Sequence, residues 1–265
     1  MRILLVGCGK MGGALLDGWL DQGLAAGNVV VVEPNLPPEG LRPGVGAIAS
    51  LEALPAGFIP DVVVLAVKPQ VMEAVIPPYA QFAGAVFLSI AAGKTLGFFA
   101  RLLSPSAAVV RAMPNTPAAV RRGMTVLVAN PNVAEAQREA CDKLLAAVGE
   151  VAWVDDEALI DAVTAVSGSG PAYVFLLAET LAQAGVAAGL PEELADRLAR
   201  ATVAGSGELL AQSADSPAVL RRNVTSPAGT TFAALQVLMA EEGGLAALLT
   251  AAVDAAARRS RELAS

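Results

Sequence analysis

The sequence predicts an α/β fold, in which a parallel-sheet domain is followed by an all-α domain. In the first half, short apolar runs alternate with helix-like segments, and such runs are typical of strands buried on both faces of a parallel sheet. After Asp155 and Asp156 these runs stop, and helical spacing continues to the end. A chain of 265 residues is long enough for two modest domains. We therefore expect one domain over residues 1–154 and a second over 155–265.

Seven apolar runs are the expected strands: Ile3–Val6, Val29–Val32, Val62–Val67, Val86–Ile90, Ala107–Val110, Thr125–Val128 and Glu150–Val154. Two helices are expected between them, at Met11–Gln22, which Gly23 ends, and at Glu135–Val148. In the second half, turn-forming residues separate the helices at 167–171, 189–191, 215–217, 226–229 and 243–244. One of these helices is expected over Phe232–Glu241.

Composition excludes several classes of function. The chain has no histidine, so Ser-His-Asp triads, histidine-ligated metals and histidine proton relays are excluded. Its net charge is −7 and its basic residues form no long patch, which argues against nucleic-acid binding. Cys8 and Cys141 lie far apart without metal-ligand spacing, so we expect no bound metal. Unpaired cysteines are typical of a reducing cytoplasm, which is the expected location.

The mean hydropathy of +0.57 is high for a soluble protein and makes a membrane span worth testing. The strongest candidate is Ala162–Ala178, but the SGSGP segment at 167–171 lies at its centre. Such a segment would interrupt the continuous backbone bonding that a membrane span needs. We therefore expect no membrane insertion and interpret the stretch as a helix buried in an oligomer interface.

The opening residues, MRILLVGCGKMGG, allow two interpretations. The letters LVGC resemble a lipoprotein cleavage box, but only Ile3–Val6 separates Arg2 from the glycines, and a signal peptide needs roughly 7–15 apolar residues. Alternatively, Gly7, Gly9 and Gly12 form a dinucleotide-binding loop between a buried strand and a helix. They would permit a tight turn, close approach of a pyrophosphate and close helix–strand packing. This context favours the dinucleotide loop over a glycine-rich turn that binds nothing.

Charged residues end two strands next to this loop. Glu33 follows the second strand, about 20 residues after the loop, where a carboxylate accepts hydrogen bonds from the adenosine ribose and repels a 2′-phosphate. It therefore favours NADH, unless its side chain faces solvent in the proline-rich loop that follows. Lys68, in the AVKP segment at 66–69, would meet cofactor phosphates or ribose. The alternative is a solvated lysine before a helix.

Two further strand ends and one polar cluster complete the candidate sites. Ala91-Ala92-Gly93 and Asn115 follow later strands, and their small side chains would let a nicotinamide approach. Residues 223–231 contain several hydroxyls at the start of a helix. Free N–H groups and hydroxyls at a helix N-terminus are a receptor for a small carboxylate. An ordinary helix cap needs only one Ser or Thr, and the sequence leaves the two roles open.

Together, these residues resemble the Δ1-pyrroline-5-carboxylate reductases, the last enzymes of proline biosynthesis. The resemblance spans nearly the whole chain, in GCGKMG (7–12), LAVKPQ (65–70), SIAAG (89–93), MPNTP (113–117), AVSGSGPAYVF (165–175) and NVTSPAGTT (223–231). It implies a Rossmann-type parallel-sheet domain followed by an all-α dimerisation domain, and reduction of a cyclic imino acid by hydride from NADPH or NADH. It also implies a homodimer through the C-terminal helices and allows larger rings such as a decamer.

The resemblance carries site residues over by position. Together with Glu33, the implied cofactor residues are Gly7, Cys8, Gly9, Lys10, Met11, Gly12, Ala66, Val67, Lys68, Pro69, Ala91, Ala92, Gly93 and Asn115. The implied substrate residues are Asn223, Ser226, Gly229, Thr230 and Thr231. Ser226 and the loop N–H groups would hold the substrate carboxylate, and the Thr231 hydroxyl would lie near the ring nitrogen. Glu33 departs from relatives that prefer NADPH, which usually carry small polar or basic residues there.

This reaction needs no histidine. A cyclic imine protonated in solution is already an electrophilic iminium, so catalysis would rest on proximity and orientation, with Thr231 as the catalytic residue that orients the nitrogen. Two rivals remain. A β-hydroxyacid-dehydrogenase-like reductase would need a lysine in the helical domain, although none follows Lys143. A non-catalytic dinucleotide-sensing module would not need the hydroxyls of 223–231.

Overall fold

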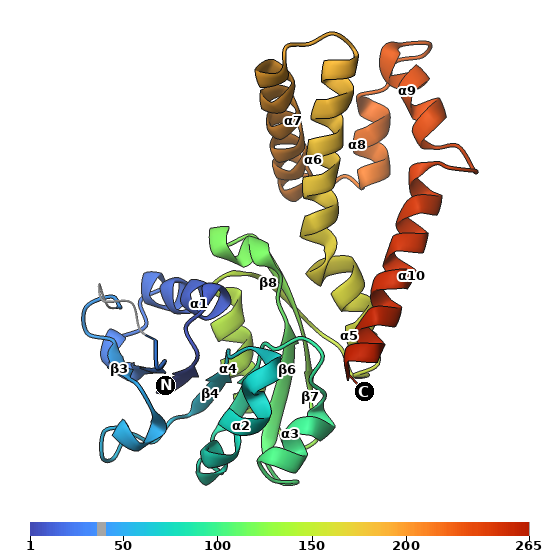
Figure 1. The fold of residues 1–265 in the computed structure, drawn as a ribbon. Coiled ribbons are helices and arrows are strands. Elements are labelled where there is room, and N and C mark those ends of the chain that lie inside the picture. The colour runs from blue at the N-terminus through green and yellow to red at the C-terminus, as the bar shows by residue number, and fades with distance from the viewer. Residues whose placement is uncertain (36–40, 265) are drawn as a thin grey trace. The chain divides into compact units, whose positions relative to one another are not determined.

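The computed structural model describes residues 1–35 and 41–264. It divides into two compact units: unit 1 combines Met1–Gly168 with Ala256–Ser265, and unit 2 is Ser169–Ala255. Unit 1 carries the sheet, and unit 2 is helical (Figure 1). The predicted fold class, a Rossmann-type α/β domain followed by an all-α domain, is confirmed.

Unit 1 is built on one eight-stranded sheet with the spatial order β3-β2-β1-β4-β5-β6-β7-β8. The strands are β1 (Ile3–Val6), β2 (Val29–Val32), β3 (Gly46–Ile48), β4 (Val62–Leu65), β5 (Val86–Ser89), β6 (Ala108–Met113), β7 (Gly123–Ala129) and β8 (Gly149–Trp153). Ile3 aligns with Val29 on one side and with Val62 on the other. The strand order therefore reverses between β1 and β4.

All seven expected runs form strands, but the sheet has two features that the sequence analysis missed. The edge strand β3, Gly-Ala-Ile, is too short to give a recognisable apolar run. β7 runs antiparallel to β6, whereas we expected parallel strands throughout. The connection 114–122 is shorter than the crossover of a dozen or more residues that a parallel pair needs. The chain therefore turns back through the short helix η5 (Thr116–Val120).

Helices α1 (Lys10–Asp21) and α4 (Glu135–Ala146) confirm the two helices expected in the first half. Besides η5 and a π-helical turn at Thr164–Gly168, the described part of unit 1 contains α2 (Met72–Val75), α3 (Leu96–Leu102), α5 (Leu159–Val163), η1 (Ala26–Asn28), η2 (Leu51–Ala53), η3 (Pro69–Val71) and η4 (Pro77–Gln81). Unit 2 holds α6 (Gly170–Ala187), α7 (Glu192–Gln212), α8 (Pro217–Asn223) and α9 (Thr230–Leu238), where we expected Phe232–Glu241. α10 (Leu245–Ala264) begins in unit 2 and ends in unit 1.

Residues 167–171 do not end the helical path, contrary to expectation, although a new α-helix starts at Gly170. α5 continues through a π-helical turn, η6 (Thr164–Gly168), and Ser169 keeps right-handed helical dihedral angles (φ −85°, ψ −24°) up to α6. Pro171 stands in the first turn of α6, where a helix has no partner for the missing N–H. The widened turn therefore contains Gly168, and the start of α6 accommodates Gly170 and Pro171.

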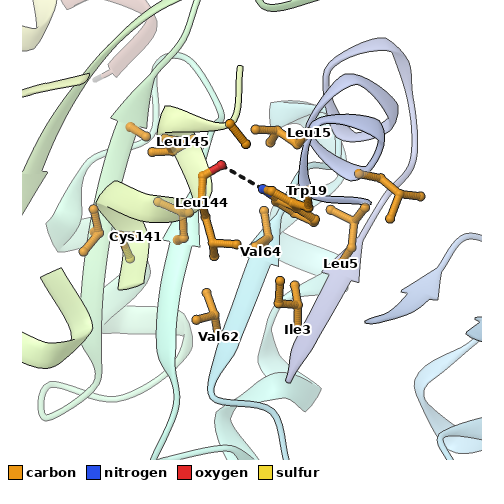
Figure 2. Close-up of a cluster of buried hydrophobic side chains, with 14 of the residues drawn as sticks. Ile3, Leu5, Leu15, Trp19, Val62, Val64, Cys141, Leu144 and Leu145 are labelled. Carbon is orange, nitrogen blue, oxygen red and sulfur yellow. Dashed lines mark hydrogen bonds between the residues drawn. The ribbon is translucent and has the colours of Figure 1, made fainter. Parts of the chain in front are cut away.

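Every residue of β1, β2, β4 and β5 is buried, because helices cover both faces of the sheet. On one face, Leu15 and Trp19 of α1 and Leu144 of α4 pack against the strands. The Trp19 Nε1–H donates to the Leu144 carbonyl at 2.8 Å and joins the two helices (Figure 2). On the other face, Met72 of α2 and Phe99 of α3 pack against the same strands.

Unit 1 extends beyond the expected boundary at residue 154 because the segment after β8 packs back on the sheet. Ile160 of α5 is fully buried in a cluster with Val126 and Val128 of β7. The end of α10 also belongs to unit 1, where the Ser260 hydroxyl donates to the Asp161 carboxylate at 2.6 Å. The chain therefore passes between the units twice, at 168–169 and at 255–256.

Unit 2 has almost no apolar interior of its own. Among its described residues, the only buried apolar side chains are those of Ala195 and Ala199. Phe175, Leu176 and Leu181 of α6 are 66%, 56% and 42% exposed. Large apolar side chains gathered on one exposed helix mark a surface that another molecule covers.

One helical stretch in the described part of the chain, Leu159–Ala187, has the length and composition of a membrane span. Its mean hydropathy is 1.3, and 11% of the apolar window is buried within the chain. The helix continues through η6, so the expected break in this stretch does not argue against a span. Its apolar surface needs a cover, which a membrane or a second protein surface would provide.

The close packing of α1 can be tested with two glycine substitutions in the same helix. A Cβ atom at Gly18 would lie 2.8 Å from Val148 Cγ1 and 3.0 Å from the Ala147 oxygen, whereas one at Gly13 would have no atom within 4 Å. Gly18→Ala is expected to lower the free energy of unfolding by about 1–3 kcal/mol because the core must shift. Gly13→Ala is expected to raise it by up to about 1 kcal/mol through helix propensity.

The measurement is urea unfolding followed by far-UV circular dichroism at one protein concentration. Equal effects of the two substitutions would contradict the close approach of α1 to the residues that follow α4.

Candidate functional site

The loop after β1 is tightly folded against the sheet. Gly7 has φ +91°, which favours glycine, and its N–H donates to the Val32 carbonyl at 2.9 Å. A Cβ atom at Gly7 would lie 2.9 Å from the Ala66 carbonyl group, and one at Gly12 would lie 2.6 Å from the Gly7 oxygen. Both positions therefore exclude a larger residue.

The same loop leaves room where a ligand would lie. A Cβ atom at Gly9 or Gly13 would have no neighbour within 4 Å. Gly9 is the N-cap of α1, no side chain caps this helix, and no acidic residue stands in its first turn. The first N–H groups of α1 are therefore available to an anion, which the helix dipole favours. This arrangement fits the pyrophosphate of a dinucleotide.

The loop lies at the point where the strand order reverses, between β1 and β4. Open α/β sheets bind ligands at this point, outside the carboxyl ends of the strands. Residues 66–69 follow β4 there; the Ala66 N–H donates to the Val6 carbonyl at 2.8 Å, and Lys68 is exposed. Residues 91–93 follow β5, with Ala92 exposed and Gly93 at φ +72°. The predicted cofactor residues therefore gather along one edge of unit 1.

Glu33 follows β2 beside the glycine loop and is half-buried. Its carboxylate accepts the Cys8 N–H at 3.0 Å and the Asn35 N–H at 3.1 Å, one at each oxygen. The side chain is thus held against the loop instead of extending into solvent. Each carboxylate oxygen has a second lone pair that can accept a hydrogen bond from a ribose hydroxyl.

Asn115 follows β6, and its side-chain amide is engaged within the chain. Oδ1 accepts the Met124 N–H at 2.9 Å. Nδ2 donates to the carbonyl and hydroxyl oxygens of Ser167 at 3.3 and 3.2 Å. Asn115 therefore links the end of β6 to β7 and to η6.

Sequence reasoning missed Glu157, which holds the end of the 91–95 loop. Glu157 Oε1 accepts the Leu96 N–H at 2.8 Å and pairs with the Arg111 guanidinium at 2.8 Å. Arg111 lies in β6 and is 3% exposed, so the pair ties the start of α3 to the sheet. The two charged residues are 46 positions apart, and no local pattern in the sequence joins them.

In unit 2, residues 223–231 run from the end of α8 at Asn223 into α9. Gly229 is the N-cap of α9, and no side chain caps this helix, so the predicted hydroxyls do not serve as its cap. The Ser226 hydroxyl lies directly against Gly229. Thr230 and Thr231 are the first two residues of α9, whose N–H groups have no intrahelical partner. This helix start, with hydroxyls beside it, suits a small carboxylate.

The predicted cofactor residues belong to unit 1, and the predicted substrate residues belong to unit 2. A hollow of about 1120 Å³ lies between α6 and α7, lined by Val174, Phe175 and Asp196 among others, and none of the predicted site residues lines it. In residues 1–35 and 41–264, no three His, Cys, Asp or Glu side chains gather in a group that could hold a metal ion.

Both parts of the chain match known families. Residues 157–263 match the family described as pyrroline-5-carboxylate reductase dimerisation. Residues 2–93 match the family described as NADP oxidoreductase, coenzyme F420-dependent. The first match includes the whole apolar stretch Leu159–Ala187 and so favours a second protein surface as its cover.

Curated relatives match over the full length. The chain is 44% identical to the pyrroline-5-carboxylate reductase of Pseudomonas aeruginosa, over 99% of this chain and 97% of that protein. It is 37% identical to the pyrroline-5-carboxylate reductase of Arabidopsis thaliana, over 99% and 95%.

Solved structures agree with these matches. The pyrroline-5-carboxylate reductase of Coxiella burnetii superposes with a TM-score of 0.91 at 35% identity, covering 100% of this chain and 98% of that one. The pyrroline carboxylate reductase of Plasmodium falciparum with NADP bound superposes with a TM-score of 0.83 at 29% identity, with the same coverage.

The contact between Glu33 and the glycine loop predicts how Cys8 titrates. Burial raises the pKa of the Cys8 thiol above its ordinary value of 9.0, and the Glu33 carboxylate raises it further. Alkylation of Cys8 by iodoacetamide is therefore expected to reach half its maximal rate above pH 9.0. Glu33→Gln should move this midpoint to lower pH without restoring the ordinary value, because burial is the larger cause.

Peptide mass spectrometry measures the labelling, with Cys141 as the internal reference. Burial raises the pKa of Cys141 to about 12, so this thiol should stay unlabelled in the folded protein. A Cys8 midpoint that does not change in Glu33→Gln would contradict the contact between the carboxylate and the loop.

Proposed function

The chain belongs to the pyrroline-5-carboxylate reductase family, and we infer from this membership that it reduces 1-pyrroline-5-carboxylate to L-proline with hydride from NAD(P)H. This reaction is the last step of proline biosynthesis. The observation that carries the function is the similarity to reductases of this family over the full length of the chain. No single motif would be as specific.

The cofactor is proposed to lie along the carboxyl ends of the strands in unit 1. The N–H groups at the start of α1 would hold its pyrophosphate, in the space beside Gly9. The Glu33 carboxylate would accept a ribose hydroxyl, and its charge would disfavour a 2′-phosphate. Residues 66–69 and 91–93 would line the remaining length of the cofactor. When bound, the reduced nicotinamide supplies the hydride.

The substrate is proposed to lie at the start of α9. Ser226 and the free N–H groups of Thr230 and Thr231 would hold its carboxylate, with Gly229 and Asn223 beside them. The Thr231 hydroxyl would orient the ring nitrogen. A protonated cyclic imine carries its own proton into the site, so these groups bind and orient, and none of them needs to act as a strong acid.

Neither rival function fits the chain as well. A β-hydroxyacid-dehydrogenase-like enzyme needs a lysine in the helical domain, and this chain has none after Lys143. A dinucleotide-sensing module needs no carboxylate receptor, whereas the start of α9 is uncapped and has a hydroxyl beside it.

Unit 2 is an oligomerisation domain. Its match to the dimerisation family and the exposed apolar side chains of α6 both support association through it. The proposed assembly is a homodimer through the C-terminal helices, and a larger ring such as a decamer is compatible with it. The proposed location is the cytoplasm, which suits the free cysteines Cys8 and Cys141.

Loss of nicotinamide absorbance with pyrroline-5-carboxylate, measured in parallel with NADH and NADPH, tests the function and the role of Glu33. The protein is expected to oxidise both cofactors, with kcat/KM about tenfold higher for NADH because the Glu33 carboxylate repels a 2′-phosphate. Glu33→Gln is expected to lower KM for NADPH by about tenfold and to change KM for NADH by less than about threefold.

Asp17→Asn is the control, because it removes an exposed carboxylate of α1 that pairs with Arg42. It should leave the ratio of the two cofactors unchanged. No oxidation by folded protein that binds cofactor would contradict the reductase function and favour the sensing module. A preference of the unmodified protein for NADPH would show that Glu33 turns away from the ribose.

Thr231→Ala is expected to lower kcat/KM for pyrroline-5-carboxylate by about 10–100-fold, because the ring nitrogen loses its orienting hydroxyl. Thr231→Ser keeps a hydroxyl and should recover most of the loss. Thr225→Ala is the matched control, since the Thr225 hydroxyl donates to the Arg221 carbonyl at 2.7 Å. Unchanged kinetics in Thr231→Ala would remove this residue from the mechanism.

A further inference from the structure

We propose that Asn115 is a positioning residue, which fixes the π-helical turn η6 through which the chain leaves unit 1 and does not hydrogen-bond the cofactor. Its hydrogen-bond partners follow from geometry alone. Its expected effect on turnover rests also on the proposed reductase function.

The orientation of the Asn115 amide follows from its partners. The Met124 backbone N–H can only donate, so the Asn115 atom 2.9 Å from it must be the oxygen. The nitrogen is thereby turned toward Ser167, where the carbonyl and hydroxyl oxygens both accept from it. A cofactor that took hydrogen bonds from the Asn115 amide nitrogen would have to break the contact with η6.

The turn that Asn115 holds is an uncommon one. A π-helical turn contains one more residue than an α-helical turn, and such turns in proteins are short and frequently lie at functional sites. The Met113 side chain, at the end of β6 two residues before Asn115, lies directly against Gly168. The end of β6 and the loop after it therefore contact the last two residues of η6, through Met113 and Asn115.

The contact between Asn115 and η6 matters because η6 ends where unit 2 begins. Ser169 begins unit 2, and α6 begins at Gly170. Each residue of an α-helix advances the chain by about 100° around the axis, so a π turn that relaxed by one residue would turn the start of α6 by roughly that angle. Losing the Asn115 contact should therefore disturb how the chain enters unit 2, while the glycine loop stays unchanged.

The same sheet offers a matched control in Asn130. This half-buried asparagine follows β7 at the opposite end of the β6–β7 pair. Its Oδ1 accepts the Val109 N–H at 3.1 Å, and its Nδ2 donates to the Ala107 carbonyl at 2.8 Å. Asn130→Ala thus removes similar hydrogen bonds from the same strands without touching η6.

The experiment compares Asn115→Ala, Asn115→Asp and Asn130→Ala in the full-length protein. Asn115→Asp keeps an oxygen for Met124 but loses the donor to Ser167, so it should behave like Asn115→Ala even if the alanine variant folds poorly. In both Asn115 variants, kcat/KM for pyrroline-5-carboxylate at saturating NADH is expected to fall about 10–100-fold. The dissociation constant for NADH, measured by fluorescence titration without substrate, should stay within about twofold of the unmodified protein.

Hydrogen–deuterium exchange gives a readout that does not depend on turnover. Exchange in peptides covering 164–170 should accelerate in the Asn115 variants and stay unchanged in Asn130→Ala, whose activity should also stay near that of the unmodified protein. A tenfold rise in the NADH dissociation constant without faster exchange would make Asn115 a cofactor ligand and overturn the proposal. Equal losses of activity in Asn115→Ala and Asn130→Ala would also overturn it. Absence of reductase activity in the unmodified protein would instead refute the proposed function, and the exchange result would still decide the role of Asn115.

Discussion

The structure of unit 1 depends on how closely α1 lies against the sheet. Gly12 has no room for a side chain because the Gly7 oxygen occupies that space, and Gly18 has none because Ala147 and Val148 do. Trp19 then joins α1 to α4 through the Leu144 carbonyl. Since α1 starts where the strand order reverses, the same close approach places its uncapped N-terminus at the carboxyl ends of β1 and β4. Core packing and the anion site are therefore parts of one helix–sheet contact.

The polar side chains at this edge hold backbone segments in place. Glu33 accepts the N–H of Cys8, Glu157 accepts the N–H of Leu96, and Asn115 accepts the N–H of Met124. A protein without histidine cannot use an imidazole as its proton carrier. An iminium substrate brings its own proton, so a rigid frame that aligns the reacting atoms is the larger requirement.

The two units obtain their stability in different ways. The central strands of unit 1 are buried along their whole length, whereas in unit 2 the buried apolar side chains in the described residues are two alanines. A helical unit with so few buried apolar side chains has little core of its own, so covering its exposed apolar surface by association would stabilise it. The exposed apolar residues of α6 are consequently explained by the dimerisation family that this region matches.

The sequence by itself determined every strand except β3, the helices α1 and α4, the fold class and the family, because each follows from residues that are adjacent or regularly spaced along the chain. Ile3–Val6 is a short apolar run before a glycine loop, a local pattern typical of a buried strand, and Gly7 permits the tight turn after it. Only the tertiary structure decided the antiparallel β7, the π turn in place of a break at 167–171, and the partners of Asn115 and Glu157. Asn115 is 52 residues from Ser167, and Glu157 is 46 from Arg111. Contacts over such separations depend on the path of the whole backbone, which local spacing does not encode.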